Sequence, residues 1–369
     1  MKIQNTESGV NNKKLAIFVW YRSLRGGGLH ENIYDTIIHL RKKFKEIVVV
    51  CPVSQYSERF YVAGARVIEV NYDNYLPEDL FDEIGDVDLI HVHPGESRVA
   101  GLKYADQKNV PALMTIHGAW FDQLPTYDSK LSYVITVSRY IEEILRKQIP
   151  SLRHRICTIE NGVDSELFEI RGDAVPEEVL LQPHVLCVSR YDKDKQKMID
   201  FMLTLWRLQH TKNIFIRWVI VGDDPLLSHI KNVATEIFTR QSPIEFVGWK
   251  EKNYLPSFYN KAACGYLPGR SAIEAMACGL PVVATGSSGG IKIINNINNI
   301  EEAAYSNFGG FGSENFIDDV DQCLEFMKQC CEGKASLSGS VLSQEIQNLF
   351  SIDNLSMKLL SLYERAIKN

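Results

Sequence analysis

No stretch of this sequence is apolar for long enough to cross a membrane. A transmembrane helix needs about 18 or more consecutive apolar residues, and no segment approaches that length. The first twelve residues are polar and lack the apolar centre of a signal peptide. We therefore expect a cytoplasmic protein whose residues 1–12 form a disordered tail.

The eight cysteines lack the spacings of a disulfide framework or a zinc site. They include no C-x-x-C pair, and most of them lie inside apolar runs. An acidic D-x-D metal motif is missing from any suitable loop as well, because Asp192 to Asp194 reads D-K-D among lysines and suits phosphate better than a cation. The sequence therefore predicts reduced, packed cysteines, no metal and no other cofactor.

An overall excess of positive charge is also missing. The formal net charge is -6, which argues against general nucleic-acid binding. Two basic clusters nevertheless occur in the first half, at Arg41 to Lys45 and at Arg146 to Arg155. A solvated surface is the simpler interpretation of both clusters. The alternative is that they dock the protein on anionic lipid.

The 369 residues are too many for one ordinary core and suit two α/β domains. Apolar strands alternate with helical patterns in both halves, and the alternation restarts at the strand H-V-L-C-V-S. The predicted fold class is α/β, with two Rossmann-like domains built on parallel sheets. We place these domains at 13–170 and 184–350, with a polar linker at 171–183.

Three segments near the C-terminus differ in their pattern. The segment N-N-I-N-N-I-E-E-A from Asn295 is polar and is expected to form a loop. Phe316 to Cys330 has the pattern of a helix. Ile352 to Lys368 carries its apolar residues on one stripe, which predicts an amphipathic C-terminal helix at 351–369.

Tyr266 to Thr285, which reads Y-L-P-G-R-S-A-I-E-A-M-A-C-G-L-P-V-V-A-T, is the most informative stretch. A strand ends at Pro268, a helix runs from about Ser271 to Cys278, and Gly279 stops it before the next strand. Such a unit places a helix N-terminus at the carboxyl edge of a parallel sheet. Helix N-termini in this position bind anions, because their first N–H groups have no partner within the helix.

The side chains of this stretch fit a phosphate beside a ribose. Gly269 lets a ligand approach the backbone, and Arg270 adds a positive charge. Glu274, one turn further on, can present its carboxylate to sugar hydroxyls. The structural alternative is a buried helix in which Glu274 forms an internal salt bridge.

Other strand ends carry residues of the same kind. Gly27 and Gly28 follow the first strand, where a phosphate could lie against the backbone, although a triple glycine can also be only a tight turn. Arg190 and Lys195 follow the strand that opens the second half, and together they supply the charge and hydrogen bonds that a phosphate needs. A lysine-rich surface turn is the alternative there.

Histidines occupy two strand ends in the first half. His117 lies where an inner strand meets its loop, a position from which side chains reach a cleft. His91 and His93 lie on one face of another strand, which could suggest a metal site. Because no third ligand has a sensible spacing, we interpret both as packing and hydrogen-bonding residues.

The run E-A-M-A-C-G-L-P-V-V-A-T, followed by Gly289 and Gly290, resembles the donor-binding signature of family 4 glycosyltransferases, which have the GT-B fold. The resemblance implies two domains that face a cleft and a terminal helix that crosses back to the first domain. It also departs from the family in one respect. Tyr266 stands where the family usually has a second Glu, and the loop before the helix is shortened to G-R-x-A-x-E-A-M-A.

The resemblance also implies roles for particular residues. Glu274 would bind the ribose of a nucleotide, while Arg190 and Lys195 would hold its pyrophosphate. His117 would contact the donor sugar or its phosphate. The remaining donor contacts that the resemblance implies come from Gly27, Gly28, Gly248, Gly269 and Arg270.

The activity implied is transfer of a sugar from a UDP- or GDP-sugar to a hydroxyl of a glycan or lipid-linked acceptor. In the resembled family the anomeric configuration is retained, no metal is needed, and cell-surface polysaccharides are common products. Peripheral contact with the inner membrane face is compatible with such acceptors. The alternatives are a non-catalytic GT-B partner subunit, a sugar phosphorylase or an epimerase.

Overall fold

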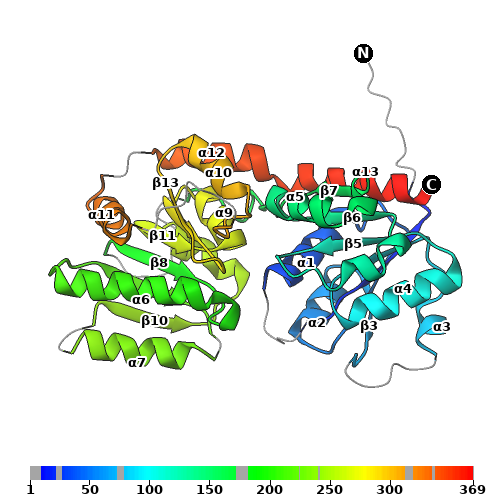
Figure 1. The fold of residues 1–369 in the computed structure, drawn as a ribbon, viewed down its shortest axis with the longest axis horizontal. Helices are drawn as coiled ribbons and strands as arrows, with labels where there is room; N and C mark the ends of the chain where they lie inside the picture. Colours follow the sequence, from blue (N-terminus) through cyan, green and yellow to red (C-terminus); the bar gives the residue numbers. More distant parts are fainter. Residues whose placement is uncertain are drawn as a thin grey trace, which may run out of the picture. The chain divides into compact units, whose positions relative to one another are not determined.

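The computed structural model describes residues 10–21, 27–72, 79–171, 182–223, 225–239, 242–311, 319–334 and 337–368. The chain divides into two compact units, which Figure 1 shows as two sheets with their helices. Unit 1 comprises Met1–Asn161 and Ile352–Asn369, and unit 2 comprises Gly162–Ser351. The linker that we predicted at 171–183 lies mostly outside the described residues.

Unit 1 is built on a seven-stranded sheet with the order β3-β2-β1-β4-β5-β6-β7, in which every neighbouring pair is parallel. The strand order reverses direction between β1 and β4, which is the topological switch point of a doubly wound sheet. The strands are β1 (Lys14–Phe18), β2 (Glu46–Cys51), β3 (Arg66–Glu69), β4 (Leu89–Val92), β5 (Ala112–Ile116), β6 (Tyr133–Thr136) and β7 (Ile156–Thr158).

Helices cover both faces of this sheet, because its strands are apolar on both sides. On one face lie α1 (Gly28–Leu40), α2 (Gln55–Val62) and α13 (Ile352–Lys368). On the other face lie α3 (Leu80–Ile84), α4 (Glu96–Lys108) and α5 (Arg139–Gln148). Short 3-10 helices follow β5 and α5 at Leu124–Thr126, Asp128–Lys130 and Pro150–Leu152.

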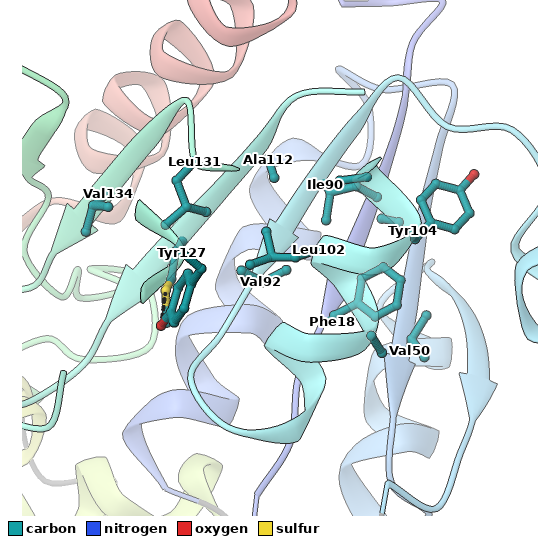
Figure 2. Packing of buried hydrophobic residues seen from close by; sticks show 14 of the residues in the cluster. Phe18, Val50, Ile90, Val92, Leu102, Tyr104, Ala112, Tyr127, Leu131 and Val134 are labelled. Atoms are coloured by element: carbon teal, nitrogen blue, oxygen red, sulfur yellow. Dashed lines mark hydrogen bonds between the residues drawn. The ribbon is translucent and has the colours of Figure 1, made fainter. Parts of the chain in front are cut away.

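Figure 2 shows the core on the second of these faces, where Leu102 and Tyr104 of α4 lie among strand residues such as Phe18 and Val92. On the opposite face, the first buried residue comes earlier in the chain than we expected. Val10 is buried there with Leu15 and Ile17, so the predicted tail does not extend to residue 12.

The C-terminal helix α13 has the predicted bounds and packs within unit 1, although the chain enters it from unit 2. Its buried Tyr363 hydroxyl lies 2.6 Å from Nδ1 of His91, and its ring packs edge-on against Phe44. The amphipathic stripe of this helix is therefore explained by burial against α1 and the first sheet.

Unit 2 is built on a six-stranded sheet with the order β10-β9-β8-β11-β12-β13. All neighbouring strands are parallel except β12 and β13, which are antiparallel. The switch point lies between β8 and β11. The strands are β8 (His184–Val188), β9 (Arg217–Val221), β10 (Ile244–Gly248), β11 (Cys264–Leu267), β12 (Val282–Thr285) and β13 (Ile291–Ile294).

Helices again cover both faces. One face carries α6 (Gln196–Thr211), α7 (Leu227–Ile237) and α11 (Val320–Cys331). The other carries α8 (Leu255–Tyr259), α9 (Gly269–Ala277), α10 (Ile297–Ala304) and α12 (Gly339–Phe350). Short 3-10 helices lie at Lys193–Lys195 and Lys252–Tyr254.

The loop that we predicted from Asn295 is wrong, because α10 occupies this segment. The Asn296 side chain accepts a hydrogen bond from the Asn299 backbone N–H at 3.1 Å and so caps the helix. Ile300 and Ala303, one turn apart, are both buried in the core of unit 2. We predicted a loop because asparagines dominate this segment and only a few apolar residues follow the helical spacing.

Gly222, directly after β9, is fixed by a close backbone crossing. Its φ is +134°, and a Cβ atom added to it would lie 2.0 Å from the carbonyl oxygen of Ser189. Its backbone N–H donates to the carbonyl of Gly248 at 2.9 Å. The carboxyl ends of β8, β9 and β10 are thus joined through one residue that has no side chain.

We expect Gly222→Ala to lower the free energy of unfolding by about 2–4 kcal/mol, because a methyl group must displace backbone at a positive φ. Gly333→Ala is the matched control, since Gly333 has φ of +72° in unit 2 but open space around its Cβ position. Urea unfolding of both variants measures the difference. Equal losses of stability would contradict the steric role of the crossing.

Candidate functional site

The predicted phosphate-binding residues of unit 2 come from the two strands that flank its switch point. Arg190 and Lys195 follow β8, and α9 begins one residue after β11. Because β8 and β11 are parallel neighbours, their carboxyl ends meet at one edge of the sheet. Ligands of doubly wound folds bind at this place, outside the strand ends at the point where strand order reverses.

Lys195 is held close to a second cation. Its Nζ lies 3.3 Å from Oγ of Ser287, which follows β12. Burial lowers the pKa of Lys195 below its usual range, and the nearby charge of Arg190 lowers it further. The Arg190 guanidinium has a carboxylate neighbour in Asp192, at 3.4 Å. Two cations at a partly dehydrated strand end form a region where an anion would be strongly stabilised.

Two glycine-containing turns line the same region. The segment Gly286–Gly290 follows β12, and the segment Ser306–Gly310 follows α10. The Ser288 hydroxyl donates to the carbonyl of Gly309 at 2.9 Å, and a Cβ added to Gly290 would lie 2.4 Å from the carbonyl oxygen of Gly310. The backbones therefore touch directly, which only residues without side chains allow.

The helix α9 combines the anion-binding geometry with an internal ion pair. Gly269 starts the helix with φ of +50°. Nε of Arg270 lies 3.1 Å from Oε1 of Glu274, and both residues are buried, at 9% and 4% exposure. Tyr259 donates to Oε2 of Glu274 at 3.4 Å. The structure thus contains the internal salt bridge of the structural alternative, and Glu274 offsets the charge of Arg270.

Gly248 closes the edge on the side of β10. Its φ is +71°, and its carbonyl accepts the hydrogen bond of Gly222 that joins β9 and β10. Trp249, the next residue, is 39% exposed. Gly248, where we predicted a donor contact, therefore lies at the end of β10. Gly222 connects it to Ser189, the residue before Arg190.

Tyr266 is not available to a ligand. Its side chain is buried in the core between the sheet and α6, and its hydroxyl donates to the carbonyl of Met198 at 2.9 Å. Tyr266 thus packs beneath α6 and binds its backbone. It therefore does not replace the glutamate that the resembled family usually carries there.

The predicted residues of unit 1 also gather at one sheet edge. Gly27 precedes α1 and Gly28 is its first residue. A Cβ added to Gly28 would meet nothing within 4 Å. His117 follows β5, and its Nε2 lies 2.8 Å from Nδ1 of His93, which follows β4. Burial lowers the pKa of His117 to about 3, with a further contribution from His30 of α1. The His117 ring is therefore neutral at physiological pH and can act only as a hydrogen-bonding group.

His91 and His93 are packing residues, as we interpreted them. His91 lies between Tyr363 and Thr115, at 2.6 and 2.7 Å, and its ring stacks on that of His93. The His93 ring stacks in turn on His117, with ring centroids 5.0 Å apart. Among the described residues, no group of three or more His, Cys, Asp or Glu is placed to hold a metal ion.

Two residues of the second basic cluster, Arg146 and Arg155, make ion pairs within unit 1. Arg146 pairs with Glu142 at 2.7 Å and donates to the carbonyl of Ile156. Arg155 pairs more loosely with Asp128, at 3.8 Å. In the first cluster, Lys42 and Lys45 are exposed. No helix in the described part of the chain is both long and apolar enough to cross a membrane.

Sequence reasoning missed Ser287 and Asn307 at these edges, and it missed the contact that His93 makes. Ser287 and Asn307 carry no sequence signal, because each reaches the edge only through the folding of a later connection. His93 was noticed, but its contact with His117 depends on β4 and β5 being neighbours. The order of strands in the sheet supplied the information that was missing.

The buried histidines predict that acid destabilises the protein. Burial lowers the pKa of both His91 and His117 to about 3, whereas unfolded histidine titrates near about 6.5. Within that window the unfolded chain binds protons that the folded protein does not, so stability falls as pH falls from about 6.5 towards 3. Each histidine contributes up to about 1.4 kcal/mol per pH unit.

We expect the urea midpoint to drop over this window, and His117→Asn to weaken the dependence by one proton. A midpoint that stays flat between about pH 6.5 and 4 would mean that these rings are not buried in the neutral form.

Two family models match the chain, one in each unit. The model described as "Glycosyltransferase Family 4" matches residues 26–167, and the model described as "Glycosyl transferases group 1" matches residues 182–305. The second match includes Arg190, Lys195 and α9. The first includes Gly27, Gly28 and His117.

Known proteins agree with these matches. An uncharacterized glycosyltransferase of Methanocaldococcus jannaschii is 27% identical over 283 residues, which is 70% of this chain and 68% of that protein. A glycosyltransferase from Rickettsia africae has a TM-score of 0.73 at 16% identity and covers 97% of this chain and 100% of its own. HepE of Anabaena, in complex with UDP and glucose, has a TM-score of 0.72 at 15% identity and covers 95% and 99%. The chain therefore has the GT-B fold, and glycosyltransferase family models match both of its halves.

Proposed function

We propose that this protein transfers a sugar from a UDP- or GDP-sugar to a hydroxyl group of a glycan or lipid-linked acceptor. The observation that carries the proposal is the proximity of Lys195 to Arg190 and to Ser287 at the switch point of unit 2, where β11 leads into α9. A nucleoside diphosphate would add negative charge beside these two cations.

The chemistry follows from where charge develops. The C–O bond between the sugar and the diphosphate breaks while the acceptor oxygen bonds to the same sugar carbon, and negative charge builds up on the departing phosphate, which takes the proton of the acceptor hydroxyl. Arg190 and Lys195 would stabilise that charge, together with the backbone N–H groups that follow Gly269 in the first turn of α9. Glu274, held rigidly by Arg270 and Tyr259, would accept hydrogen bonds from the ribose hydroxyls.

Neutral His117 has a different role in this proposal. Burial lowers its pKa to about 3, so the ring is uncharged at physiological pH before a ligand binds. It would orient the sugar by hydrogen bonding, with one ring nitrogen already engaged by His93. Gly27 and Gly28 would let a substrate phosphate approach the start of α1.

A UDP-sugar is the donor class to test first. HepE of Anabaena, with which the chain shares its fold, has been solved with UDP-glucose. Retention of configuration, independence of metal ions and a place in cell-surface polysaccharide synthesis belong to the proposal through the family resemblance. The protein would act in the cytoplasm. Exposed Lys42 and Lys45 could contact anionic lipid at the inner face of the membrane.

The proposal is tested by following nucleotide release from a panel of UDP-, GDP-, ADP- and TDP-sugars, with and without sugar acceptors. We expect release from one nucleotide class, unaffected by EDTA and accelerated by an acceptor. Tight binding of a nucleotide without any release would instead identify a non-catalytic partner subunit. Release that requires inorganic phosphate would identify a phosphorylase.

We expect Arg190→Ala and Lys195→Ala each to weaken binding of the nucleoside diphosphate by about 10- to 100-fold, because each removes a charged hydrogen-bond donor. Lys193→Ala is the matched control, since Lys193 lies in the same short helix but is exposed. Calorimetric titration with UDP and GDP provides the measurement. A loss of affinity in the control as large as in the two site variants would point to general surface charge instead of a defined site.

A further inference from the structure

The connection between β11 and α9 is too short to carry a sugar-binding side chain. Only Pro268 separates the two elements, and Tyr266 before it is buried in the core. A donor bound with its diphosphate at the start of α9 must therefore find any sugar contact within unit 2 on another segment. The described residues near the start of α9 show which part this is.

The turn that follows α10 covers the first residue of α9. The Gly269 backbone N–H donates to the carbonyl of Phe308 at 3.4 Å. The Asn307 carboxamide lies beside it, with Nδ2 3.8 Å from the position that a Cβ on Gly269 would take. The side chain of Asn307 thus lies over the helix N-terminus, where the usual longer loop is missing.

The buried side chain of Phe308 fixes the conformation of this turn. Asn307 and Phe308 both have φ of +54°, which is unusual for two successive residues with side chains. Phe308 is buried, with its ring edge-on to Phe350 at 5.8 Å, and Phe308 N–H donates to the carbonyl of Ala303 at 2.8 Å. The packing of Phe308 therefore fixes the position of the neighbouring Asn307.

The same turn is joined to the phosphate-binding residues. Gly309 accepts the hydrogen bond of Ser288, and the adjacent Ser287 lies beside Lys195. A single connected set of contacts therefore runs from the Lys195 ammonium to Asn307. This turn therefore lies next to the position proposed for the diphosphate.

We propose that Asn307 recognises the sugar of the donor, and that its carboxamide takes the place of the carboxylate missing at Tyr266. This inference rests on the proposed function. A carboxamide both donates and accepts hydrogen bonds, as sugar hydroxyls also do, and it adds no negative charge beside the diphosphate. Because the segment from Asn295 to Gly310 provides it, α10 and its turn form part of the donor site.

Asn307→Gly tests the proposal, because glycine removes the carboxamide and keeps the left-handed backbone without strain. Asn213→Gly is the matched control, since Asn213 also has φ of +54° in unit 2 but is exposed after α6. Calorimetry measures the affinity of each variant for two ligands. They are the nucleotide that the wild type binds and the nucleotide sugar that the wild type binds most tightly. Thermal melting of each variant checks that it is folded.

We expect Asn307→Gly to lose about three- to tenfold in affinity for the nucleotide sugar and to keep its affinity for the free nucleotide. Asn213→Gly should keep both affinities. Equal loss for the two ligands, or no loss for either, would overturn the assignment of Asn307 while leaving the proposed function intact. If the wild type binds neither ligand, the proposed function itself fails and the inference fails with it.

Discussion

The charge on Lys195 is the constraint on which the site of unit 2 depends. Burial and the neighbouring Arg190 oppose this charge, the carboxylates of Asp192 and Asp194 partly offset them, and the Ser287 hydroxyl lies 3.3 Å from the Lys195 ammonium. A charged group in this environment is costly until an anion arrives. The diphosphate of a donor would relieve that cost, and binding would become stronger because the cations are already in place. The edge of the sheet is thus arranged for a ligand more than for stability.

Backbone contacts keep these cations in place. Gly222 packs against Ser189, one residue before Arg190, and the glycines after β12 pack against those after α10. Such contacts are rigid because no side chain can adjust between them. The edge of unit 1 is organised differently, through the stacked rings of His91, His93 and His117, and α13 supplies the hydroxyl of Tyr363 beneath them. The last helix of the chain therefore contacts this stack through His91.

The sequence predicted the elements whose signals are local. Pro268 and Gly279 bracket α9, and the amphipathic stripe of α13 gives its bounds, because caps and periodicity are properties of a few neighbouring residues. It failed where the answer depends on contacts distant in the chain. The asparagine-rich α10 is helical because Ile300 and Ala303 find a core to enter, and Tyr266 is excluded from the site because α6 lies over it. The partners of Arg270 and Lys195 also became known only from the fold.

The central claim is that the edge beside Lys195 and α9 binds the diphosphate of a nucleotide. The most direct measurement compares the affinities of UDP and uridine, and of GDP and guanosine, for the wild-type protein under the same salt conditions. The account predicts that one diphosphate binds about a hundredfold or more tightly than its nucleoside, because the charge-assisted contacts supply most of the affinity. A nucleoside that binds as tightly as its diphosphate would contradict it.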